Sequence, residues 1–181
     1  MAEDPDLALL RAEAPHARIE ACWRLEGRIT GARVGARSRR PPETAEARAQ
    51  LREAAIVALA PLVDDDGVWS GQGPANFDGD RLESHLHVAA IAVRTLAAIA
   101  PERAPIDRIA AALVRLDGRL AERHHTNFSA PIEAPLRWPP ALLRAFGPPL
   151  ERALADLAEG SPDERTRQVA ARLLEAARRG R

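Results

Sequence analysis

Histidines and carboxylates gather at two places in the chain, and together they have the composition of a metal site. On a helix, Glu83 and His87 would share one face, with Asp80 about one turn earlier. His124 and His125 come later in the sequence and would have to be brought to the same point by the fold. Because carboxylates with histidines suit zinc or iron, one hypothesis is a metal-dependent enzyme with a Glu/His site. Its candidate ligands are Asp80, Glu83, His87, His124 and His125.

The motifs of known enzymes argue against this hypothesis. The sequence contains no HExxH, no Cys-x-x-Cys and no G-x-S-x-G pattern. On a helix, His85 and His87 would point about 200° apart, which is too far to share an ion. A structural role also explains His124 and His125, because they would lie near a helix C-terminus, where positive charge is favourable. We therefore expect no cofactor and no enzymatic activity.

The segment 28–40, RITGARVGARSRR, is the strongest local concentration of positive charge. It holds five arginines and two glycines without any acid, and two prolines follow it. One interpretation is a solvated basic Gly/Arg linker over residues 28–42. The alternative is a surface that contacts nucleic acid, another anion or an acidic protein. The residues that would make this contact are Arg28, Arg33, Arg37, Arg39 and Arg40.

The segment 64–80 is acidic, rich in glycine and carries Trp69 and Phe77. It does not match a calcium-binding EF-hand loop, because the position that should hold a bidentate acid, counted from Asp64, is Ala75. We expect an acidic surface loop in which Trp69 and Phe77 either pin the loop to the body or meet a partner. Its charge is opposite to that of the arginine segment, so the two could also join copies of the chain in a homo-oligomer.

The elements that must position these residues are all predicted to be helices. Alanine and leucine dominate the apolar residues, β-branched residues are few, and no run alternates convincingly between polar and apolar. Prolines and glycines separate the apolar patterns. The predicted helices cover residues 7–10, 19–25, 43–60, 82–100, 106–123, 139–146, 150–158 and a last helix opened by a capping box at 161–164, and residues 124–138 are predicted to be irregular.

Residues 82–100 are the centre of the predicted fold. From Val88 onward only Arg94 and Thr95 interrupt the apolar residues, so this helix must be covered on nearly all sides. The apolar run is too short to span a membrane, and Arg94 lies in its middle. Near the N-terminus, Cys22 and Trp23 are predicted to pack inward. The fold class is therefore all-α, with residues 1–181 forming one domain around a buried central helix.

Three helices share a pattern of paired alanines, a late leucine and an arginine on the polar side. They are QLREAAIVALAPL (50–62), HLHVAAIAVRTLAAI (85–99) and RTRQVAARLLEAARR (165–179). The last one, preceded by Ser161-Pro162-Asp163, resembles the second helix of a HEAT-type repeat. The resemblance implies a short α-solenoid with a non-catalytic surface for a protein or nucleic-acid partner. A compact irregular bundle is the alternative architecture, because the alanine pairs do not keep a fixed period.

Composition narrows the class of function. The 26 basic and 26 acidic residues give a formal net charge of zero, which argues against global steering toward nucleic acid or a membrane. The acidic start, MAEDPD, lacks the apolar core of a signal peptide, and the use of arginine without lysine is typical of GC-rich bacteria. We expect a cytoplasmic bacterial protein without a membrane partner. The leading hypothesis is a helical protein–protein interaction or adaptor module, and nucleic-acid binding through residues 28–40 is the second.

Overall fold

The structure is a computed structural model that describes residues 3–31, 44–75, 81–126 and 129–179. For residues 70–75, 81–85, 120–126 and 129–134 it describes the backbone only. The first half contains α1 (Pro5–Leu9), α2 (Pro15–Thr30), α3 (Ala45–Leu59), the 3-10 turn η1 (Ala60–Asp64), β1 (Val68–Ala75), β2 (Arg81–His87) and α4 (Val88–Ile99). The second contains the 3-10 turn η2 (Pro101–Arg103), α5 (Ile106–Leu116), β3 (Leu120–Thr126), β4 (Ser129–Pro135), α6 (Pro140–Ala145), α7 (Gly147–Gly160) and α8 (Glu164–Arg178).

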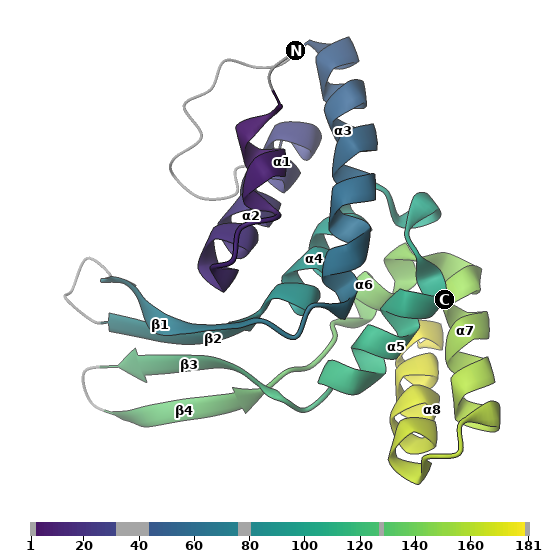
Figure 1. The fold of residues 1–181 in the computed structure, drawn as a ribbon. Helices are drawn as coiled ribbons and strands as arrows, with labels where there is room; N and C mark the ends of the chain where they lie inside the picture. The colour runs from purple at the N-terminus through teal and green to yellow at the C-terminus, as the bar shows by residue number, and fades with distance from the viewer. Residues whose placement is uncertain (1–2, 32–43, 76–80, 127–128, 180–181) are drawn as a thin grey trace.

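The helices form one body around α4, and two β-hairpins extend from it side by side (Figure 1). Helices α2 and α3 pack against α4 from the N-terminal part of the chain, and α5 and α6 pack against it from the C-terminal part. Helices α7 and α8 form an antiparallel pair that contacts α5. The helical body confirms the all-α class, and the two hairpins are an addition that the sequence patterns did not predict.

The central helix is buried, as predicted, but it begins at Val88 and not at Leu82. Val93 and Leu96 are fully buried and Ile91 is 4% exposed, so α4 is covered on nearly all sides. Residues 82–87 lie in β2, which pairs antiparallel with β1 in a register that joins Val68 to His87. The Ser-His-Leu-His stretch has weaker helix propensity than the alanine-rich run that follows it, which favours the change at Val88.

The predicted helix 106–123 is also too long, and residues 124–138 are not irregular. Helix α5 ends at Leu116, and Gly118 adopts a left-handed φ of 75° that turns the chain into the second hairpin. The Gly118 N–H donates to the Leu136 carbonyl at 2.9 Å, which closes the base of this hairpin. The buried indole N–H of Trp138 donates to the Leu113 carbonyl at 2.9 Å and fixes the exit of β4 against α5.

Further predictions about local structure also need correction. Within the predicted acidic loop 64–80, Val68–Ala75 form strand β1, and residues 28–30 of the predicted basic linker 28–42 belong to α2. Trp23 is 36% exposed, so of the predicted inward pair only Cys22 is buried. Helix α8 begins two residues later than the capping box implied, because Asp163 and not Ser161 is its N-cap.

The two hairpins repeat each other in sequence as well as in shape. An Asp-Gly pair precedes each first strand, at 66–67 and 117–118. An Asn-Phe pair follows at the same spacing, at 76–77 and 127–128, and these pairs lie outside the described residues. Each hairpin is also closed at its base by a backbone hydrogen bond from the segment that follows it: Val88 N–H to the Gly67 carbonyl, and Leu136 N–H to the Arg119 carbonyl. The chain thus uses one hairpin design twice.

Candidate binding groove along α5

Of the five candidate arginines in the segment 28–40, the structure describes only Arg28. Arg28 lies in α2, is 10% exposed, and donates to Asp4 at 2.8 Å and to Asp6 at 2.7 Å. These hydrogen bonds lower the pKa of the Asp4 carboxyl below its usual range. Arg28 is therefore part of an internal ion-pair network, and its role as a partner contact stays a prediction. Arg33, Arg37, Arg39 and Arg40 lie outside the described residues.

Of the two aromatic candidates in the acidic segment 64–80, the structure describes Trp69 but not Phe77. Trp69 is half-buried and packs against the helical core, as expected of a residue that holds the hairpin to the body. Phe77 lies outside the described residues.

The predicted metal ligands are spread over the hairpins. Glu83 and His87 lie in β2, and His124 and His125 lie in β3, whereas Asp80 lies outside the described residues. The helical spacing used to relate Glu83 to His87 and to separate His85 from His87 is therefore wrong. Among the residues whose side chains are described, no three His, Cys, Asp or Glu residues group closely enough to hold a metal.

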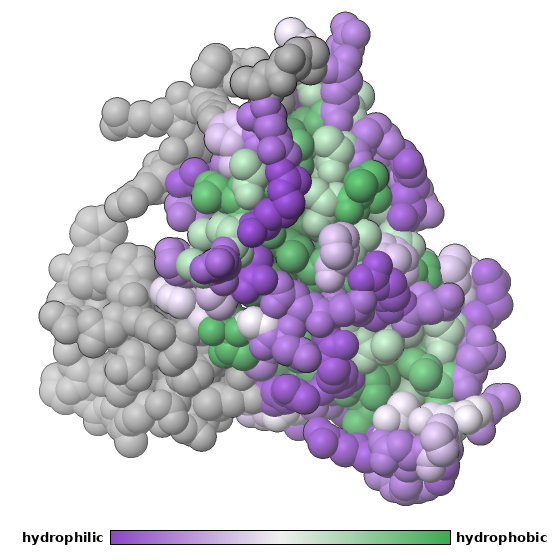
Figure 2. All heavy atoms as spheres, viewed as in Figure 1, coloured by the Kyte–Doolittle hydropathy of each residue, from purple (hydrophilic) through white to green (hydrophobic). Residues whose placement is uncertain are grey.

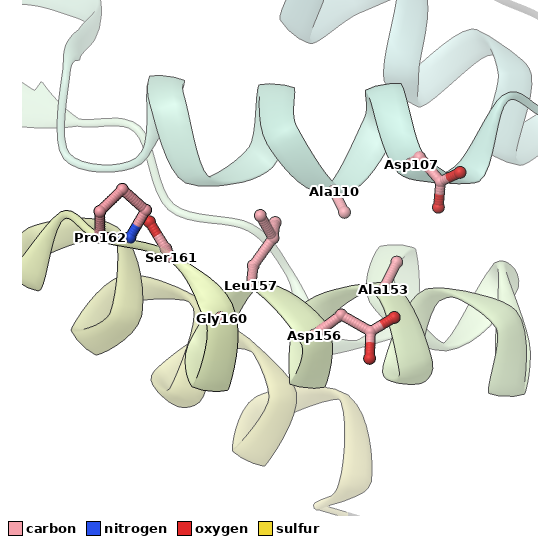
Figure 3. A pocket seen from close by; sticks show the side chains of 8 residues that line it. All are labelled: Asp107, Ala110, Ala153, Asp156, Leu157, Gly160, Ser161 and Pro162. Atoms are coloured by element: carbon pink, nitrogen blue, oxygen red, sulfur yellow. The ribbon is translucent and has the colours of Figure 1, made fainter.

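A groove lies between α5 and the α7–α8 pair, and the sequence patterns did not predict it. Its first part is a hollow of about 470 Å³ between α5, α7 and the turn after α7 (Figure 3). Its second part, of about 400 Å³, lies between α5 and the start of α8. Leu157 lines both hollows, so they adjoin at this side chain. We call the two together the α5 groove.

Small side chains on facing helices create the first hollow. Ala110 of α5 and Ala153 of α7 face each other across it and are both buried, and Gly160 adds no side chain near its end (Figure 3). The helices run in the same direction along the hollow, because Asp107 and Ala153 lie at one end and Gly160 and Ser161 at the other. Larger residues at the two alanines would fill the space between the helices, so the hollow is a direct consequence of composition.

The second hollow is held in place by the cap of α8. The Asp163 carboxylate accepts from the Thr166 N–H at 2.7 Å and from the Thr166 hydroxyl at 2.7 Å. The side-chain hydrogen bond from Thr166 lowers the pKa of Asp163 below its usual range. This cap fixes the first turn of α8 opposite Val114 and Arg115 of α5. Figure 2 shows apolar residues exposed between α5 and the α7–α8 pair, with hydrophilic residues around them.

Opposite charges mark the two ends of the α5 groove. Asp107 and Asp156 line the first hollow, and no ion pair to either carboxylate occurs within the described part of the chain. Arg119 and Arg165 line the second hollow, and neither forms an ion pair with a described carboxylate. Nearby arginines are already engaged, since Arg108 binds Asp64, Arg172 binds Asp117 and Arg167 binds Glu164. The four charged side chains that line the groove therefore lack ion-pair partners among the described residues, whereas the arginines next to the groove are paired with carboxylates.

Comparison of the chain with protein families, curated proteins and solved structures finds no match. The resemblance of three helices to HEAT-type repeats stays a prediction. One of those helices was taken to begin at His85, yet residues 85–87 belong to β2. What the groove can do follows from its own chemistry. No histidine, cysteine or serine–histidine pair lines it, and it offers an apolar floor between acidic and basic ends.

Proposed function

We propose that this protein is a non-enzymatic helical interaction module that holds a helical segment of a protein partner in the α5 groove. The observation that carries the proposal is Leu157, which lines both hollows and lies between two carboxylates and two arginines without described ion-pair partners. Apolar grooves of this kind bind amphipathic helices through side chains spaced three and four residues apart. The helical pair α7–α8 supports the proposal, because these two helices pack on each other and on α5 and so hold the lining residues of the groove in place.

The chemistry of the groove defines the partner. Leu157, Val114 and Ala111 would contact the apolar face of the bound helix. Asp107 and Asp156 would bind lysine or arginine near one end of it, and Arg119 and Arg165 would bind acids near the other. Along α5, Asp107 and Arg115 are separated by about 12 Å at the rise of an α-helix, so the partner needs two to three turns.

The other hypotheses drawn from the sequence stay predictions, and the α5 groove does not support them. Nucleic-acid binding through residues 28–40 stays a prediction, since Arg28 also pairs internally with Asp4 and Asp6 and the other arginines lie outside the described residues. A cytoplasmic location and a homo-oligomer also stay predictions. No helix among the described residues has both the length and the hydropathy needed to cross a bilayer.

A selection of peptides on the intact chain tests the groove. We expect a displayed library of helical peptides to yield sequences with apolar residues at helical spacing, basic residues toward one end and acidic residues toward the other. Leu157→Arg should weaken the selected peptides at least about tenfold, which corresponds to ~1.4 kcal/mol. Leu174→Arg is the matched control, because Leu174 lines a separate shallow hollow on α8. Equal binding by both variants would contradict the proposal.

Charge reversal gives a second and stricter test of orientation. The double variant Asp107→Lys, Asp156→Lys should lose the selected peptides and regain them when their basic residues are replaced by glutamate. This rescue requires direct pairing, because a misfolded groove would bind neither peptide. Binding that is unchanged by the double substitution would place the peptide elsewhere on the surface.

A further inference from the structure

Three arginines gather at the end of the α5 groove where α5 finishes and α8 begins. Arg115, Arg119 and Arg165 line the second hollow, which has a volume of about 400 Å³. One carboxylate, that of Asp163, and the apolar side chain of Leu157 are also among its described lining residues. We call the three arginines the arginine cluster. The second hollow therefore combines an excess of positive charge with an apolar wall.

Backbone carbonyls hold two members of the arginine cluster in place. The Arg119 Nε donates to the Arg115 carbonyl at 3.2 Å, about one turn earlier in the chain. The Arg115 Nη2 donates to the Val63 carbonyl at 3.1 Å, and its guanidinium also pairs with Asp66 at 3.4 Å. Within the described part of the chain, the two terminal nitrogens of Arg119 have no ion pair. A guanidinium that is fixed at Nε loses less side-chain entropy when its terminal nitrogens bind a ligand.

The carboxylate in the second hollow is committed to the cap of α8. Asp163 accepts from the Thr166 N–H and from the Thr166 hydroxyl, both at 2.7 Å. Arg165 lies in the same first turn and forms no ion pair with a described carboxylate. Arg119 and Arg165 are therefore two positive charges, from opposite walls of one hollow, that a negatively charged ligand can pair with.

Two positive charges in one hollow match a dianion better than a monoanion. A carboxylate side chain carries a single negative charge, whereas a phosphate monoester carries about −1.5 to −2 at pH 7 and offers three acceptor oxygens. Arginine binds phosphate oxygens through two parallel N–H···O bonds, which a single carboxylate cannot supply to two arginines at once. Clusters of arginine are also a recurring means of binding phosphorylated peptides.

We propose that the second hollow binds a phosphorylated serine or threonine side chain of the partner helix, through Arg119 and Arg165. The inference rests on the proposed function, because the helix in the α5 groove brings the phosphate to the hollow. Leu157 lines both hollows, so a helix that rests on this side chain passes beside the arginine cluster. Phosphorylation of the partner then strengthens its binding, so the contact is controlled by a modification of the partner and not of this chain.

The test compares three forms of one selected peptide on the full chain, at constant ionic strength. An acidic residue near the arginine end of the peptide is replaced by serine, phosphoserine or glutamate, and each affinity is measured by fluorescence anisotropy. We expect phosphoserine to bind at least about tenfold tighter than serine, the value of one charged hydrogen bond, and tighter than glutamate.

Two double variants locate the effect. Arg119→Gln with Arg165→Gln should bring the ratio of phosphoserine to serine affinity close to one. Arg178→Gln with Arg179→Gln is the matched control, because it removes the same charge at the opposite end of α8, where Arg178 pairs with Glu151. The control should keep the ratio of the wild type. Because the readout is a ratio on each protein, a general loss of peptide affinity does not imitate it.

Failure of this inference is distinguishable from failure of the α5 groove. A wild-type ratio near one, or an equal ratio in both double variants, overturns the phosphate site while the groove stands. If no helical peptide binds, inorganic phosphate is titrated onto the chain alone and followed by the amide NMR signals of Arg165 and Thr166. Saturable shifts that are lost in the Arg119, Arg165 double variant support the phosphate site and overturn only the groove. Without saturable shifts, both are overturned.

Discussion

Cys22 lies fully buried in α2, packed within the helical core. Burial raises the pKa of its thiol to about 12, because the thiolate would lose its hydration. The reactive form is therefore almost absent at neutral pH. This agrees with the sequence expectation of a small core residue.

Alkylation followed by mass spectrometry checks this expectation. The folded chain should not react with iodoacetamide at pH 7 over the time in which an exposed thiol reacts completely. After unfolding in guanidinium it should take up one group, because Cys22 is the single cysteine of the sequence. Complete modification of the folded chain would mean that α2 opens readily.

Among single residues, we expect Arg28 to make one of the largest contributions to stability through its ion pairs with Asp4 and Asp6. Arg28→Ala would remove the cation that lies 2.7 Å from Asp6, a carboxylate whose side chain is 3% exposed. We expect the free energy of unfolding in urea to fall by about 3 kcal/mol, the lower end for a buried pair, because Arg24 remains near Asp6. Arg11→Ala is the control. Its pair with Glu3 is exposed, so the loss should stay below about 1 kcal/mol.

The same network predicts a pH dependence. The pKa of Asp4 is lowered in the fold, so its contribution to stability is complete above the ordinary aspartate value of 3.8. It is lost as the pH falls through the lowered pKa. We therefore expect the stability difference between wild type and Arg28→Ala to be constant near neutral pH and to shrink below 3.8. A difference that grows in acid would assign the effect to packing of the arginine stem.

At the scale of elements, glycine backbone geometry decides where α5 stops and the second hairpin starts. Gly118 has a φ of 75°, and an added Cβ would meet no atom within 4 Å. Any cost of Gly118→Ala therefore comes from the left-handed backbone and not from a clash. Gly160 at the end of α7 is equally open but does not have a left-handed φ.

These two glycines form a matched pair of variants. Gly118→Ala should lower the free energy of unfolding by about 1–2 kcal/mol, the cost of the left-handed conformation for a residue with a Cβ. Gly160→Ala should leave it unchanged or raise it by less than about 1 kcal/mol, because alanine favours a helix. Urea unfolding of both proteins gives the comparison. Equal shifts would mean that the left-handed turn is not maintained at Gly118.

For the whole molecule, α4 is the element on which the two halves of the chain meet. It contacts α2 and α3 on the N-terminal side and α5 and α6 on the C-terminal side. Leu96 is fully buried in its middle. If residues 1–181 fold as one domain, a cavity at this position must weaken both halves together, because neither has a core without α4.

Hydrogen exchange on Leu96→Ala tests this cooperativity. We expect a loss of about 2–5 kcal/mol of stability, as for other leucines in protein cores. The most protected amides of α2 and α8 should lose protection by the same amount. Val57→Ala is the control, since Val57 is 74% exposed and should change stability by less than about 0.5 kcal/mol. A loss confined to one half would divide the chain into two domains.

Local patterns were sufficient for the parts of the fold that depend on neighbours in sequence. The cap of α1 is readable from Asp4-Pro5, where the Asp4 carboxylate accepts from the Asp6 N–H at 2.9 Å. Burial of α4 is readable from its apolar residues on all sides, because such a helix has no face to present to water. The same patterns placed Cys22 in the core.

Tertiary structure decided what depends on residues distant in sequence. A strand is stabilised by its partner, so His85 and its neighbours read as helix until β1 pairs with them. From the sequence, Arg28 was placed in a basic segment without partners, because Asp4 and Asp6 lie more than twenty residues earlier. The α5 groove combines residues of α5, α7 and α8, and no single stretch carries its pattern. The sequence alone determined which segments are apolar and where prolines and glycines end the helices. Only the packing of the helices determined which charged side chains remain available to a partner.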